Sequence, residues 1–213
     1  MTSSLPSKPS VVYADSSEFS SATEEVLTEM GVNVNKVTSN HLVEDFLQKN
    51  PDTSAVIMRN NSYGPPENMG LNIATHLIQN TSFKGPVIIL TGYLHRSMSN
   101  MIPEEYRQTA RIEIFDSILE PYASFLYIAL RAKYPKETEG FGKNDLVKIL
   151  GFSEDERTEL PDLADHEEYY QSTLDLVLEI SQQHGSDEAY GMILAKINQL
   201  KTNKEGGLNH KER

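Results

Sequence analysis

Five short apolar runs, each followed by a segment with helical spacing, constrain the fold of this chain more than any other feature. The clearest run covers residues 86–90 (Pro-Val-Ile-Ile-Leu) and is closed by Thr91 and Gly92. A run this short that is apolar on both faces is typical of a parallel strand buried on both sides. The other four runs predict strands at residues 10–14, 32–37, 54–58 and 111–114.

Helical spacing fills the intervals between these runs. In the first interval Phe19, Val26, Leu27 and Met30 fall on one helical face, and Gly31 supplies the left-handed residue expected just past a helix. Regular alternation of strand and helix predicts an α/β fold: a doubly wound, five-stranded parallel sheet with helices on both faces. Further helices are predicted at residues 42–47, 71–78 and 125–130, with a short one between 95 and 110.

The strand-like runs stop behind Pro135, and the rest of the chain predicts a second, smaller, all-helical domain. Helices are expected at residues 145–150, from Ser153, over 166–183, and from Ser186, which can cap a helix that runs through Leu200. The predicted division is a tail at 1–9, the α/β domain at 10–135, an acidic helical domain at 136–202 and a tail at 203–213.

Charge and composition exclude several classes of function. The formal net charge is -12, and the part from Lys136 onward has 9 Lys+Arg against 17 Asp+Glu, a net of -8 that leaves -4 for the front part. Acidity of this kind repels phosphate backbones, and because no basic stripe offsets it, we do not expect nucleic acid as a partner. The chain has no apolar stretch long enough to cross a bilayer and no signal peptide, so we expect a soluble, cytoplasmic protein.

The order of the β-α units, with an acid after the first strand and a threonine after the fourth, resembles the receiver domain of bacterial two-component response regulators. The resemblance covers about 120 residues and implies a flavodoxin-like, receiver-like sheet. In that family the first strand ends in two acids, the third in the phosphoacceptor aspartate, the fourth in Thr or Ser, and the fifth in Lys-Pro. The corresponding positions here are Ala14 and Asp15, Arg59, Thr91, and Glu120 before Pro121.

These departures predict a degenerate site that is not phosphorylated in the usual way. Receivers use three carboxylates to hold Mg²⁺, and a lysine to neutralise a phosphate oxygen. Here Ala14 removes one carboxylate, Arg59 replaces the nucleophile, and Glu120 adds negative charge where positive charge is wanted. Since a site with one carboxylate beside a guanidinium holds Mg²⁺ poorly, we predict a pseudo-receiver without metal or cofactor.

Asp15 and Arg59 have two readings. They could form an ordinary ion pair at the carboxyl edge of the sheet. That pair could also hold the domain in one fixed conformation, which would make it a constitutive interaction module. No catalytic constellation is present, because the six histidines lack metal-ligand spacing and the chain has no cysteine. The sequence therefore predicts a protein that is not an enzyme.

Two aromatic features also have alternative readings. Tyr169 and Tyr170, next to the acidic run at 162–168, either form an exposed patch for a basic partner or place one tyrosine in the helical core. The face of the helix at 125–130, with Phe125, Tyr127 and Ile128, lies where receiver domains often dimerise. Burial of that face against the helical domain would explain it equally well.

The leading prediction is a phosphorylation-independent signalling adaptor, in which the helical domain contacts another protein or a second copy of the chain. The alternative is a response-regulator-like transcription regulator, with a helix-turn-helix at residues 145–160. The acidic second helix of that motif argues against DNA contact, because it would face a phosphate backbone of the same charge.

Overall fold

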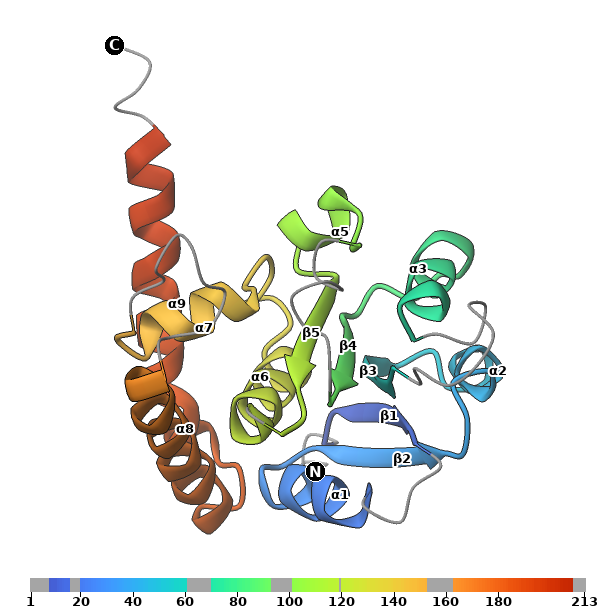
Figure 1. The fold of residues 1–213 in the computed structure, drawn as a ribbon, viewed down its shortest axis with the longest axis horizontal. Helices are drawn as coiled ribbons and strands as arrows, with labels where there is room; N and C mark the ends of the chain where they lie inside the picture. Colours follow the sequence, from blue (N-terminus) through green and yellow to red (C-terminus); the bar gives the residue numbers. More distant parts are fainter. Residues whose placement is uncertain are drawn as a thin grey trace, which may run out of the picture.

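A five-stranded, all-parallel sheet forms the centre of the computed structural model, which describes residues 8–15, 20–60, 70–92, 101–118, 120–152 and 163–208. The strands lie in the order β2-β1-β3-β4-β5, as in a flavodoxin-like fold, so the predicted doubly wound sheet is confirmed (Figure 1). The strands are β1 (Ser10–Ala14), β2 (Asn33–Val37), β3 (Thr53–Arg59), β4 (Val87–Thr91) and β5 (Ile112–Asp116).

Helices cover both faces of the sheet, and alternate residues of each strand feed two separate cores. Val11 and Tyr13 of β1 face the core under α1 and α6, whereas Val12 and Ala14 face the core under α2 and α3. Both layers therefore exclude water from the sheet, which explains the continuous apolar runs. The helices are α1 (Ser20–Glu29), α2 (Leu42–Lys49), α3 (Gly70–Asn80), α5 (Glu104–Gln108) and α6 (Pro121–Lys133).

The part of the chain behind Pro135 is helical in the described residues, as predicted. It consists of α7 (Lys143–Ile149), α8 (Leu163–Gln182) and α9 (Asp187–Leu208). Helix α8 packs on the side of α6 away from the sheet, whereas Lys143 at the start of α7 contacts β5 (Figure 1). Helix α9 runs beyond the boundary predicted at residue 202. The second helix of the predicted helix-turn-helix, from Ser153, lies outside the described residues.

One buried core joins the sheet to these C-terminal helices. Val177 and Ile180 of α8 and Ile193 of α9 belong to the same apolar cluster as Tyr13 and Phe115 of the sheet. Tyr127 and Ile128 of α6 are fully buried, and α8 packs against α6. Burial against the helical part is therefore the correct reading of the α6 face.

The tyrosine pair of α8 agrees with the second alternative, in which one tyrosine lies in the helical core. Tyr169 is 1% exposed and packs edge-on against Phe152, while Tyr170 is partly exposed and packs against Tyr122 of α6. One tyrosine therefore belongs to the helical core, and the other reinforces the contact with α6.

Two left-handed glycines make a close backbone contact between the two parts. Gly31 follows α1 with φ of 86°, as predicted, and Gly185 precedes α9 with φ of 64°. A Cβ at Gly185 would lie 2.2 Å from the carbonyl oxygen of Met30, so no larger residue fits. Tyr190 donates a 2.8 Å hydrogen bond to the same carbonyl, and Lys133 Nζ donates to the carbonyl of Gly185.

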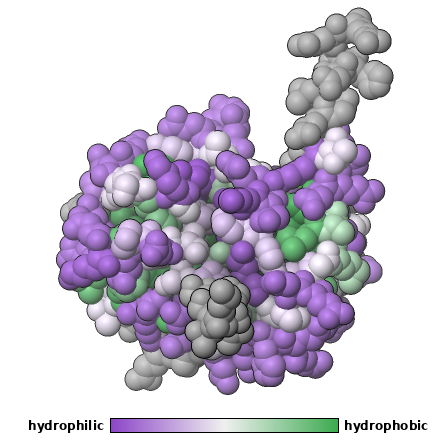
Figure 2. Space-filling view, turned by 180° about the vertical axis from the view of Figure 1, so that it is seen from behind, coloured by the Kyte–Doolittle hydropathy of each residue, from purple (hydrophilic) through white to green (hydrophobic). Residues whose placement is uncertain are grey.

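The face drawn in Figure 2 is mostly hydrophilic, and polar residues interrupt its apolar areas. None of the helices in the described ranges is both long enough and apolar enough to span a membrane. Large apolar side chains that remain exposed are Leu42, Met101, Ile118, Leu178 and Met192.

Candidate functional site

The carboxyl ends of the parallel strands meet at one edge of the sheet, where polar side chains follow four of the strands. Asp15 follows β1, Arg59 ends β3, Thr91 ends β4 and Asp116 ends β5. Asp15, Thr91 and Asp116 are all less than 10% exposed. We call these four residues the carboxyl-edge site, because ligands of doubly wound folds bind at this edge.

Arg59 and Asp15 form an ion pair within this site, as one reading of the sequence predicted. The distance from Arg59 Nε to Asp15 Oδ2 is 3.0 Å, and the carboxylate is 3% exposed whereas the arginine side chain is 38% exposed. The pairing follows from topology, because β1 and β3 are neighbours and Ala14 lies opposite Met58. The Asn40 side chain also donates to the Arg59 carbonyl at 2.9 Å, which fixes the end of β3.

Tyr13 completes this cluster. Its hydroxyl donates a 2.8 Å hydrogen bond to Asp15 Oδ2. Burial, together with the bond to Asp15, raises the pKa of Tyr13 to about 12. Burial opposes the charge on Arg59, but contact with Tyr13 and the charge of Asp15 outweigh it and raise the Arg59 pKa. Tyrosine and guanidinium therefore stay protonated at neutral pH.

The carboxyl-edge site does not fit the Mg²⁺ that the receiver resemblance implies. Asp15 is already compensated by Arg59, and its neighbour Ala14 offers only a methyl group, buried in the core. Asp116 lies three strands from Asp15 in the sheet order, about 14 Å at roughly 4.8 Å per strand, too far for both to bind one ion. Across the described ranges, no three acidic or histidine side chains gather in a way that could hold a metal ion.

The placement of Glu120 at the end of the fifth strand is wrong. Strand β5 ends at Asp116, in register with Thr91, and Glu120 is the residue that precedes α6. Hydrophobic periodicity does not encode the length of the connection between strand and helix, so the end of β5 could not be located from it. Asp116, and not Glu120, therefore ends the fifth strand.

Glu120 instead pairs with a cation from α7. Lys143 Nζ lies 2.6 Å from Glu120 Oε2, and both side chains are almost fully buried. The backbone N–H of Asp116 donates to the same oxygen at 3.1 Å. Lys143 also contacts the carbonyl of Ile114 at 3.4 Å and lies over the ring of Phe115. Because β5 is an edge strand, this contact covers part of the edge of the sheet on that side.

Three residues of this region were missed from the sequence. Tyr13 could have been found, because residues two apart on a strand point to the same side, and Asp15 is two residues further on. Asp116 would have followed from a correct end of β5. Lys143 carries no local signal, since it is 23 residues from its partner in the sequence.

No model of a known protein family and no curated protein matches this sequence. One solved structure similar to the chain is described as a yeast Spc42 trimeric coiled coil, amino acids 181–211, fused to another structure. The two share 13% sequence identity with a TM-score of 0.41, over 58% of this chain and 79% of that chain. A TM-score this low carries no argument about fold or function.

Proposed function

We propose that this chain is a non-enzymatic signalling adaptor, a phosphorylation-independent pseudo-receiver that acts by binding another protein. The observation that supports it is the ion pair between Arg59 and Asp15, 3.0 Å apart at the ends of β3 and β1. A receiver needs a carboxylate at the end of its third strand as nucleophile and as metal ligand. A guanidinium at that point supplies neither and repels a divalent cation.

The same ion pair favours a constitutive module over a switch. Asp15 is neutralised by Arg59 and hydrogen-bonded to Tyr13, so the cluster carries its own counter-charge and needs no added ion. A domain fixed in one state presents the same surface at all times. The helical part, with a net charge of -8 from Lys136 onward, favours a partner with a basic surface.

The test is incubation of the protein with acetyl phosphate and Mg²⁺, followed by intact mass spectrometry. We expect no phosphoryl gain, and no rise of the melting temperature with Mg²⁺. The variant Arg59→Asp should bind Mg²⁺ and melt at a higher temperature in its presence, because it places a second carboxylate beside Asp15. Lys36→Asp is the matched control, since it makes the same charge change at an exposed position of β2.

Two results would overturn the proposal. One is a phosphoryl gain on the parent protein that is stable or base-labile. The other is binding to duplex DNA that weakens with added salt, which would favour the transcription regulator instead.

A further inference from the structure

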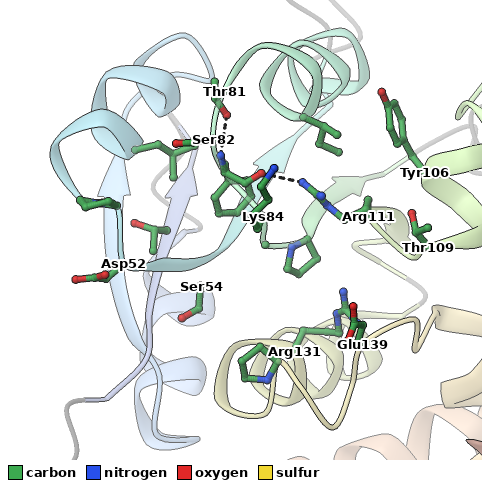
Figure 3. A pocket seen from close by; sticks show the side chains of 18 of the residues that line it. Asp52, Ser54, Thr81, Ser82, Lys84, Tyr106, Thr109, Arg111, Arg131 and Glu139 are labelled. Carbon is green, nitrogen blue, oxygen red and sulfur yellow. Dashed lines mark hydrogen bonds between the residues drawn. The ribbon is translucent and has the colours of Figure 1, made fainter.

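An open groove of ≈1310 Å³ lies at the amino ends of the strands, opposite the carboxyl-edge site. Its walls come from the segments that precede β3, β4 and β5 and from the turn that follows α6 (Figure 3). We call it the amino-edge groove. It is large enough to accept a small organic molecule.

Two arginines lie at the base of this groove. Arg131 of α6 is 6% exposed and Arg111, just before β5, is half-buried. Arg111 Nη2 donates to the carbonyl of Phe83 at 2.9 Å, and Arg131 donates to the carbonyls of Thr138 and Ala110. These contacts place both guanidinium groups on backbone carbonyls instead of carboxylates.

Neither arginine forms an ion pair with a described residue, although Arg131 lies close enough to Glu113 to oppose the burial that raises the pKa of that carboxyl. Among the described residues no carboxylate lies within 4.0 Å of either guanidinium, and the Nε atoms of both are buried without a hydrogen-bond partner. Burial and the charge of Arg131 lower the pKa of Arg111, as expected for two cations close together. Buried cations in this situation are stabilised by an anion.

The acidic residues of the groove are placed differently from the arginines. Asp52, Glu105 and Glu139 are exposed, so water screens them, and the partly exposed Glu44 lies 3.4 Å from His76 Nε2. The exposed Lys84 lies close to Arg111 in the view of Figure 3. The base of the groove is therefore positive and its rim carries both signs, a pattern that admits a small anion and repels a polyanion such as nucleic acid.

Apolar side chains form the remaining wall. Leu47, Ile78, Phe83 and Tyr106 line the groove between α2, α3 and α5. A ligand with an anionic group and a small apolar or aromatic body would match both parts of the groove.

We propose that the amino-edge groove binds a small organic oxyanion, a carboxylate or a phosphate monoester, with Arg111 as the main contact. The planar guanidinium of Arg111 can donate two parallel hydrogen bonds to such a group. Arg131 adds positive charge behind it, and Lys84 adds a cation at the rim. This site is separate from the carboxyl-edge site, so it stands whether or not the adaptor function holds.

The experiment is a titration of the ¹⁵N-labelled protein with benzoate, phenyl phosphate or neutral benzamide, followed by two-dimensional NMR. We expect saturable shifts of the amides of Lys84, Gly85 and Arg111 with at least one of the two anions, and none with benzamide. Comparison of benzoate with phenyl phosphate distinguishes the carboxylate from the phosphate.

Matched variants separate specific binding from general electrostatics. Arg111→Gln should weaken binding roughly tenfold or more, the loss expected for hydrogen bonds to a charged group. Lys84→Gln, at an exposed position that the fold does not need, should weaken it by a smaller factor. Lys36→Gln removes the same charge from β2, far from the groove, and should leave the affinity unchanged.

Three outcomes would overturn the proposal. The first is that neither anion produces saturable shifts. The second is that benzamide produces shifts equal to those of the anions. The third is an equal loss of affinity in Lys84→Gln and Lys36→Gln. The last comparison stands even if Arg111→Gln fails to fold.

Discussion

The cations at the two edges of this sheet are compensated in different ways. Near the carboxyl edge, Arg59 is paired with Asp15 and Lys143 is paired with Glu120, at 3.0 and 2.6 Å. At the amino edge, Arg111 and Arg131 donate their hydrogen bonds to backbone carbonyls, and Arg131 also lies over the ring of Tyr127. A cation with an internal carboxylate has no need of an external ion, whereas a buried cation without one favours an anionic ligand. The difference predicts that the first edge is closed and the second open to binding.

The largest effect should come from breaking the Lys143–Glu120 pair. Lys143→Met leaves a buried carboxylate without its cation, and we expect the free energy of unfolding to fall by about 3–5 kcal/mol. Urea denaturation measures this loss. The double variant Lys143→Met with Glu120→Gln should recover part of it, because the remaining side chain is uncharged. A loss as large in the double variant would show that packing, and not charge, holds α7 to the sheet.

A smaller effect should come from Glu113, which lies on β5 between the two edges. It faces Lys143, Arg131 and Asp145, and burial raises its pKa from 4.5 to about 7 despite the hydrogen bond from the Lys143 N–H. A carboxyl whose pKa is raised in the folded state stabilises the protein most at acid pH. This stability is lost as the pH rises from about 4.5 through 7.

Glu113→Gln tests this pH dependence directly. The variant should be more stable than the parent above pH 7, by on the order of 1–2 kcal/mol, and its denaturation midpoint should vary less with pH. Glu105→Gln, at an exposed position of α5, is the control and should keep the parent's pH profile. Identical profiles for parent and Glu113→Gln would contradict the prediction.

The smallest effect should come from the Arg59–Asp15 pair at the carboxyl edge, whose arginine is 38% exposed. Arg59→Met should lower the free energy of unfolding by about 1 kcal/mol, because solvent screens part of the attraction to Asp15. Arg59→Lys keeps the charge, so its free energy of unfolding should fall by less. High salt should reduce the difference between the parent and Arg59→Met, and a difference that is independent of salt would argue against an electrostatic role.

Much of the fold could be predicted from the sequence, but only part of the carboxyl-edge site. The five apolar runs gave the strands and Gly31 gave the end of α1, because both signals are local. Asp15, Arg59 and Thr91 were placed at one edge, since each ends or follows a parallel strand. Glu120 was misplaced because nothing in the pattern marks where β5 ends and α6 begins.

The contact between the two parts of the chain was also beyond the sequence pattern. The pattern shows where strands give way to helices near Pro135, yet one apolar core passes through both parts. In the sequence Gly185 indicates only a break between two helices, whereas in the structure its lack of a Cβ lets it lie against Met30.

The sequence by itself determined the order of strands and helices, the place of Arg59 at the end of a strand, and the acidity of the helical part. These depend on residue type and on spacings of a few residues, which backbone geometry converts directly into faces and turns. Only the tertiary structure decided which charges are compensated. Lys143 reaches Glu120, and Arg111 comes close to Arg131, through chain packing that brings distant residues together. Electrostatic pairing depends on distance in space and on burial, and the local sequence determines neither of them.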